Sequence, residues 1–107
     1  MHDSIEIIES GYEFLLAYAA QGRDNDTGTD VRTTLIAMSE SAQAIVAGLE
    51  SGTREFDSVI VSDATKAGAA IRYVLEQEKI GSELVDNLNA SIHLRALLTD
   101  LFLISEV

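Results

Sequence analysis

Apolar residues recur at helical spacing along nearly the whole chain, in four segments that are separated by glycine-containing breaks. This spacing places apolar side chains along one face of an α-helix. The sequence contains no proline, so the commonest interruption to helices is missing. We therefore predict an all-α fold.

The breaks define a single helical domain, residues 1–107, with helices at about 4–21, 31–51, 54–79 and 83–105. Short breaks around Gly52 and Gly81 predict antiparallel neighbours, and the simplest topology is an up-down-up-down four-helix bundle. The polar loop 22–29 contains no anchoring residue, so we expect it to be mobile. Residues 54–62 are ambiguous, because the β-branched run 59–61 also fits a short extended piece. The apolar stripe continues through this run, which favours the longer helix.

Composition excludes several classes of protein. The chain has no cysteine, which removes disulfides, thiolate metal sites and cysteine nucleophiles. No apolar run approaches the ~20 residues that span a bilayer, and the N-terminus lacks the basic start of a secretory signal. We expect a cytoplasmic protein that does not bind membranes. The formal charge of −11 repels nucleic acid and favours a basic protein as a partner, or reflects solubility in a saline host.

The predicted helix 83–105 is apolar on two sides. Leu84, Val85, Leu88, Ile92, Phe102 and Leu103 fall on one side, and a second series falls roughly opposite. A helix at the surface of a bundle needs only one apolar stripe. We therefore predict that the second series, with extra apolar residues of helix 4–21, forms an interface in a homodimer or other homo-oligomer. These residues are Ile7, Phe14, Tyr18, Ala90, Leu94, Leu97, Leu98, Leu101 and Ile104. The alternatives are a central helix in an irregular monomer and a hetero-partner.

A polar line on the same predicted helix is the one candidate for chemistry. It consists of Asp86, Asn89, His93 and Asp100. A histidine near carboxylates has its charged form favoured, and helical phosphotransfer domains carry a histidine on a four-helix bundle. However, no carboxylate directly follows His93, and no lysine-glycine pair is present. Packing between two apolar faces is the simpler interpretation of this line.

No catalytic or metal-binding motif occurs in the sequence. Glu-x-x-His pairs, a Gly-x-Ser-x-Gly elbow and a phosphate-binding Gly-Lys-Ser/Thr loop are all missing. We therefore expect no metal and no cofactor. The sequence favours a small acidic interaction module, an adaptor, regulator or inhibitor that acts as a homo-oligomer. The alternatives are histidine-dependent phosphotransfer through His93 and binding of a small apolar ligand between the first and last helices.

Overall fold

The computed structural model describes all residues 1–107 and contains five helices and no strands. They are α1 (His2–Ala19), α2 (Val31–Leu49), α3 (Glu55–Leu75), α4 (Ser82–Ala90) and α5 (Ile92–Ser105). The all-α prediction is confirmed, but the count of four helices is wrong. The chain from 83 to 105 is two helices, because the backbone at Ser91 is extended (φ −65°, ψ 140°).

The ambiguous segment 54–62 is helical. α3 begins at Glu55, and the carboxylate of Asp57 accepts a hydrogen bond from the backbone N–H of Arg54 at 3.2 Å. This bond satisfies one of the N–H groups that the first turn of a helix leaves unpaired. The β-branched run therefore continues a helix that has already started, and α3 is continuous to Leu75.

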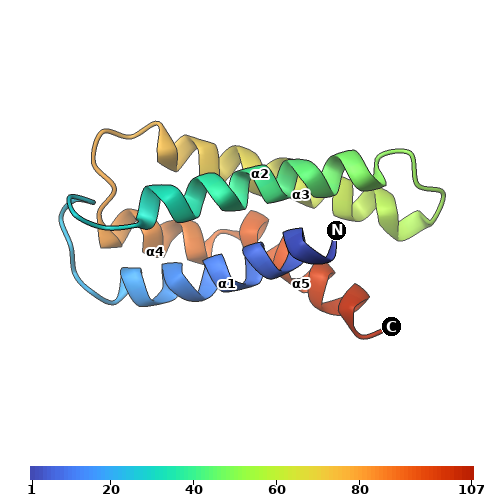
Figure 1. Cartoon of the computed structure of the whole chain (residues 1–107), viewed down its shortest axis with the longest axis horizontal. Coiled ribbons are helices and arrows are strands. Elements are labelled where there is room, and N and C mark those ends of the chain that lie inside the picture. The colour runs from blue at the N-terminus through green and yellow to red at the C-terminus, as the bar shows by residue number, and fades with distance from the viewer.

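The first four helices run alternately in opposite directions along the long axis of the molecule, and α5 continues in the direction of α4 (Figure 1). α2 packs against α1 and α3, and the last stretch of chain closes the arrangement. Its first half, α4, packs mainly on α1, whereas its second half, α5, packs mainly on α3. The break at Ser91 therefore lets the chain cross from one side of the molecule to the other. None of the five helices has the length and hydropathy that a membrane-crossing helix requires.

One apolar core runs the length of the molecule and draws residues from all five helices. Close approach of α1 and α2 depends on Gly11, since a Cβ there would lie 2.6 Å from the side chain of Met38. The largest fully buried side chains are Tyr18, Ile8, Leu15, Leu35, Met38, Ile45, Ile60, Ile71, Ile80, Leu94, Leu97 and Leu101. Burial of each large apolar side chain contributes roughly 1.5–3 kcal/mol, so this core is the main stabilising element.

The break at Ser91 also changes which face of α5 is inside. The Ser91 hydroxyl accepts a hydrogen bond from the backbone N–H of Leu94 at 3.3 Å and so caps a new helix. One extended residue resets the helical phase, so the faces of α4 and α5 do not follow the 100° steps of one helix. The inner face predicted for 83–105 holds in α4, where Val85 and Leu88 are buried, and fails in α5.

Candidate functional site

The residues predicted as an interface lie mostly inside the chain. Tyr18, Leu94, Leu97, Leu98 and Leu101 are buried in the core, and Phe14 and Ile104 are half-buried against it. Only Ile7 and Ala90 are exposed. The prediction that the leucines of α5 face a partner is therefore wrong. The prediction assumed one uninterrupted helix through Ser91, where the backbone is in fact extended. This assumption exchanged the buried and exposed faces of α5.

The face of α5 that does reach solvent is also apolar. Ile92, Phe102 and Leu103 are 74%, 52% and 57% exposed, although the sequence pattern placed all three in the core. We name the solvent-facing surface of this helix the α5 outer face, and define it as Ile92, His93, Arg95, Thr99, Phe102 and Leu103. The excess of apolar surface expected from the sequence is present, on the opposite side of the helix.

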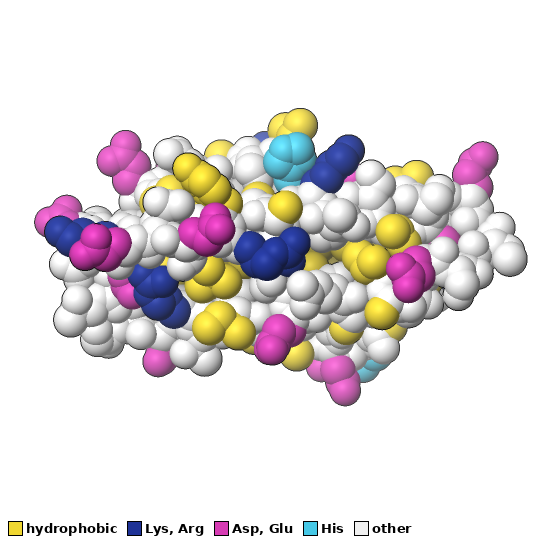
Figure 2. Space-filling view, turned by 90° about the horizontal axis from the view of Figure 1, so that it is seen from above, with side chains coloured by type: hydrophobic (Ala, Val, Ile, Leu, Met, Phe, Trp, Pro, Cys, Tyr) yellow, Lys and Arg dark blue, Asp and Glu magenta, His cyan; other side chains and the backbone are white.

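The α5 outer face contains no carboxylate. The one acidic residue within α5, Asp100, is buried, whereas Arg95 and His93 are exposed. This is unusual for a chain with 18 acidic and 7 basic residues. Figure 2 looks onto the upper side of the molecule in Figure 1, where separate hydrophobic groups lie among acidic and basic side chains. The α5 outer face is thus an apolar, non-acidic surface on an acidic protein.

The predicted polar line is not assembled. Asp86 and His93 are exposed, on α4 and α5 respectively, and His93 takes part in none of the three ion pairs. Asn89 is buried and donates to the carbonyl oxygen of Leu15 in α1 at 3.1 Å. Asp100 is buried in α5, and the charged side chain that acts on it is Asp63 of α3 instead. The break at Ser91 separates the members of the line, so His93 has none of the carboxylate support that the sequence suggested.

Asp63 and Asp100 form a contact that sequence reasoning missed; we call it the carboxyl pair. Asp100 is only 6% exposed, and its Oδ2 atom is buried with no donor in reach. Burial, then the hydrogen bond with Asp63 and its negative charge, raises the pKa of Asp100 to about 7. No lysine, arginine or histidine pairs with Asp100. A helical pattern that places a lone aspartate among leucines was the available signal.

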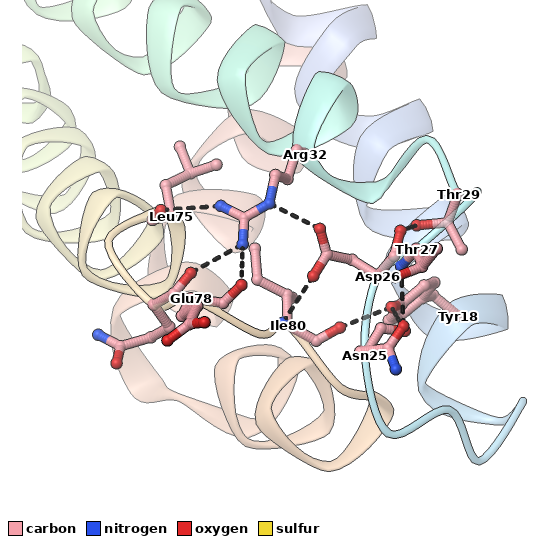
Figure 3. A network of polar contacts seen from close by, with 10 residues as sticks. Tyr18, Asn25, Asp26, Thr27, Thr29, Arg32, Leu75, Glu78 and Ile80 are labelled. Carbon is pink, nitrogen blue, oxygen red and sulfur yellow. Dashed lines mark hydrogen bonds and ion pairs between the residues drawn. The ribbon is translucent and has the colours of Figure 1, made fainter.

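A second polar cluster ties two loops together at one end of the molecule, and we call it the Arg32 network (Figure 3). The guanidinium of Arg32 donates to the carbonyl oxygens of Leu75 (3.1 Å), Gln77 (2.7 Å) and Glu78 (2.9 Å). It also donates to the carboxylate of Asp26 at 2.6 Å. The hydrogen bond from Arg32 and that from the backbone N–H of Ile80 lower the pKa of Asp26 below its usual value.

The same cluster holds the loop that we expected to be without anchors. The hydroxyl of Tyr18 donates to the carbonyl oxygens of Ile80 (2.6 Å) and Asn25 (3.1 Å). The backbone N–H of Ser82 donates to the carbonyl oxygen of Arg23 at 2.8 Å, and the hydroxyl oxygen of Ser82 accepts a hydrogen bond from the backbone N–H of Arg23 at 2.8 Å. Gly22 and Gly28 take positive φ angles of 65° and 73°, which glycine adopts without strain. The expectation that loop 22–29 lacks an anchor is therefore wrong.

Hollows on the surface offer little to a small apolar ligand. The one between the first and last helices measures about 530 Å³, and its lining mixes Met1, Ile5, Ile104 and Val107 with His2, Glu6, Glu9, Arg54 and Ser105. A more apolar groove of about 290 Å³ lies between α3 and α4 and is lined mainly by Ala70, Tyr73, Val74, Leu84 and Leu88. No three acidic or histidine side chains lie close enough together to hold a metal ion.

Comparison with protein-family models, with curated proteins and with solved structures gave no significant match for this chain. The function is therefore argued from the surfaces described above.

Proposed function

We propose that this protein is a non-catalytic interaction module that self-associates through the α5 outer face. The observation that carries the proposal is the exposure of Ile92, Phe102 and Leu103 on a helix without an exposed carboxylate, in a chain of formal charge −11. Grouped large apolar side chains in water are typical of interaction surfaces.

Charge favours a second copy of the chain as the occupant of this face. A basic partner would gain no attraction from this face, because its one charged side chain, Arg95, is positive. Two copies that meet at α5 bring together helix faces that carry no carboxylate. An isologous dimer of this kind needs only one self-complementary patch.

The mass of the protein in solution tests the proposal. Light scattering on the wild-type chain at about 100 µM, well above a micromolar dissociation constant, is expected to give a dimer. The double variant Phe102→Glu/Leu103→Glu is expected to give a monomer with unchanged helical circular dichroism. A matched control is Leu16→Glu/Ile36→Glu, which adds the same charge at exposed apolar positions of α1 and α2. A monomeric wild type, or equal dissociation of the control, would contradict the proposal.

Ionic strength separates self-association from binding to a basic partner. Two chains of charge −11 repel one another, so added salt screens the repulsion and is expected to strengthen the dimer. A basic partner, bound at the acidic faces that the dimer leaves open, would instead be weakened by salt. Sedimentation of the protein alone, at 20 mM and 500 mM NaCl, measures how salt changes the dissociation of the dimer. A dimer that dissociates in high salt would argue against apolar contact as its basis.

A further inference from the structure

We infer that Asp63 and Asp100 form a proton-binding site, in which one proton shared by the two carboxyl groups holds the C-terminal half of α5 against α3. Release of that proton to solvent loosens this half of the helix. The inference goes beyond the proposed function and does not depend on self-association.

The burial of Asp100 and its unsatisfied oxygen favour a proton on the pair. Two ionised carboxylates are acceptors only, so a hydrogen bond between Asp63 and Asp100 exists only when one of them carries hydrogen. Oδ2 of Asp100 is buried without any donor, and a proton on the pair removes this deficit. An unpaired buried charge is the costly alternative. The arrangement resembles in principle other carboxyl pairs that share one proton because like charges cannot both ionise at close range.

No positively charged side chain forms an ion pair with Asp100. Of the helices packed against α5, which are α1, α3 and α4, only α3 brings a charged side chain, Asp63, to Asp100. The basic groups nearest in sequence, Lys66 on α3 and Arg95 on α5, are exposed and form no ion pair. The charge of the pair is therefore balanced by a proton or not at all.

The position of the pair makes its protonation state matter for α5. Asp100 lies in the second half of α5, and the main packing partner of this helix is α3, which carries Asp63. The other end of α5 is held by the cap at Ser91 and by Leu94 in the core. Repulsion between two carboxylates therefore acts on the last two turns, while the first turn stays attached.

Proton release falls in the neutral range. Burial and Asp63 raise the pKa of Asp100 to about 7, whereas in the unfolded chain its ordinary value applies. The native pair thus binds more protons than the open form between these values. The hold on α5 is complete only below the ordinary pKa of an aspartate, and it is lost progressively as the pH rises from there to about 7.

Amide hydrogen exchange on the whole chain tests the inference. After correction for intrinsic rates, protection of residues 98–105 is expected to fall about tenfold between pH 6 and pH 8, because opening releases one proton. Asp100→Asn, which keeps a hydrogen bond without a charge, is expected to abolish this fall. Asp86→Asn, at an exposed position of α4, is a matched control that is expected to retain it.

Two results would overturn the inference. One is wild-type protection that does not change between pH 6 and pH 8; the other is an equal fall in Asp100→Asn. Should that variant not fold, Asp63→Asn breaks the pair from α3 and is expected to remove the same pH dependence. Carboxyl ¹³C shifts of the wild type give a direct reading, with an Asp100 inflection expected near pH 7 and an inflection near pH 4 counting against the site. Each measurement is repeated on Phe102→Glu/Leu103→Glu, so that dimer dissociation is not mistaken for loosening of α5.

Discussion

The Arg32 network and the carboxyl pair both join segments far apart in the sequence, but one has a cation at its centre and the other does not. In the network, Arg32 satisfies Asp26 and three carbonyl oxygens, and the pKa of Asp26 is lowered. In the pair, Asp100 has only another carboxyl group, and its pKa is raised to about 7. The same side-chain chemistry therefore makes a contact that weakens in acid at one place and in alkali at the other.

The signs follow from the unfolded chain, in which both aspartates have ordinary pKa values. The lowered pKa of Asp26 contributes stability above its ordinary value, and this stability is lost as the pH falls through the native value. The raised pKa of Asp100 contributes stability below its ordinary value, and this is lost as the pH rises toward 7. The comparison shows that the partner of a carboxyl group decides its role. A carboxylate beside a cation stabilises the fold at neutral pH, whereas one beside a second carboxyl group stabilises it only while a proton is bound.

Removing the cation from the Arg32 network is expected to have the largest effect. Arg32→Ala removes the side-chain donor of three carbonyl oxygens and leaves Asp26 with only the backbone N–H of Ile80, and we expect a loss of roughly 3 kcal/mol in the free energy of unfolding. Urea unfolding at pH 7 measures it. Lys79→Ala, at an exposed position in the adjoining loop, is the control and is expected to change stability by less than about 0.5 kcal/mol. Equal losses in the two variants would mean that the network contributes little.

Removing the charge from the carboxyl pair is expected to raise stability in alkali. At pH 8 the wild type holds two carboxylates in contact, so Asp100→Asn is expected to be more stable by about 2–3 kcal/mol. At pH 5, where the wild-type pair keeps its proton, the two proteins are expected to differ little. Urea unfolding across this range measures the difference. A variant that is less stable than the wild type at pH 8 would contradict this assignment of charge.

Giving the pair a cation is expected to make it behave like the network. Asp63→Lys places an ammonium beside Asp100, so the pKa of Asp100 is expected to fall and the stability of the contact to be lost in acid rather than in alkali. At pH 8 we expect a gain of about 1–2 kcal/mol over the wild type. The slope of unfolding free energy against pH, between 5 and 8, checks the reversal. Asp86→Lys makes the same change of charge at an exposed position of α4. It is expected to leave the slope of unfolding free energy against pH as in the wild type.

The neutral part of the network is expected to give the smallest effect. Tyr18→Phe removes a hydroxyl that donates to Ile80 and Asn25 and leaves the ring in the core. We expect a loss of about 1 kcal/mol that is the same at pH 5 and pH 8, because no charge is removed. Thermal unfolding at the two pH values measures it. A loss that differs between pH 5 and pH 8 would contradict the assignment of Tyr18 as a neutral contact.

The sequence predicted the helices well and the site poorly, for a common reason. Helical spacing is a local property, so α1, α2 and α3 were found within a few residues of their ends. The face of a helix that is buried depends on its phase, and one extended residue at Ser91 reset that phase for α5. Two apolar faces on one predicted helix were read as a need for a partner, whereas the chain buries one face of α4 and the other of α5.

The two polar clusters could not be predicted from the sequence, for a different reason. The Arg32 network joins the loop after α1 to the loop after α3, and the carboxyl pair joins α3 to α5. Neither cluster has a local motif that joins its two sides, because Asp63 and Asp100 lie 37 residues apart and Arg32 lies 43 to 46 residues from the carbonyl oxygens that it contacts. A polar residue such as Asp100 within a leucine-rich stretch is visible in the sequence, but its partner is not.

Tyr18, Ser82 and Arg32 each make hydrogen bonds to the connecting loops, and these fasten both connections at one end of the molecule, the end where α1 passes into α2 and α3 into α4. The opposite end has one connection, residues 50–54, together with the two chain ends. The two ends of the molecule are therefore expected to differ in their resistance to local unfolding. We expect the helices to separate first at the end with the single connection, and the two hydrogen-bonded loops at the other end to unfold last.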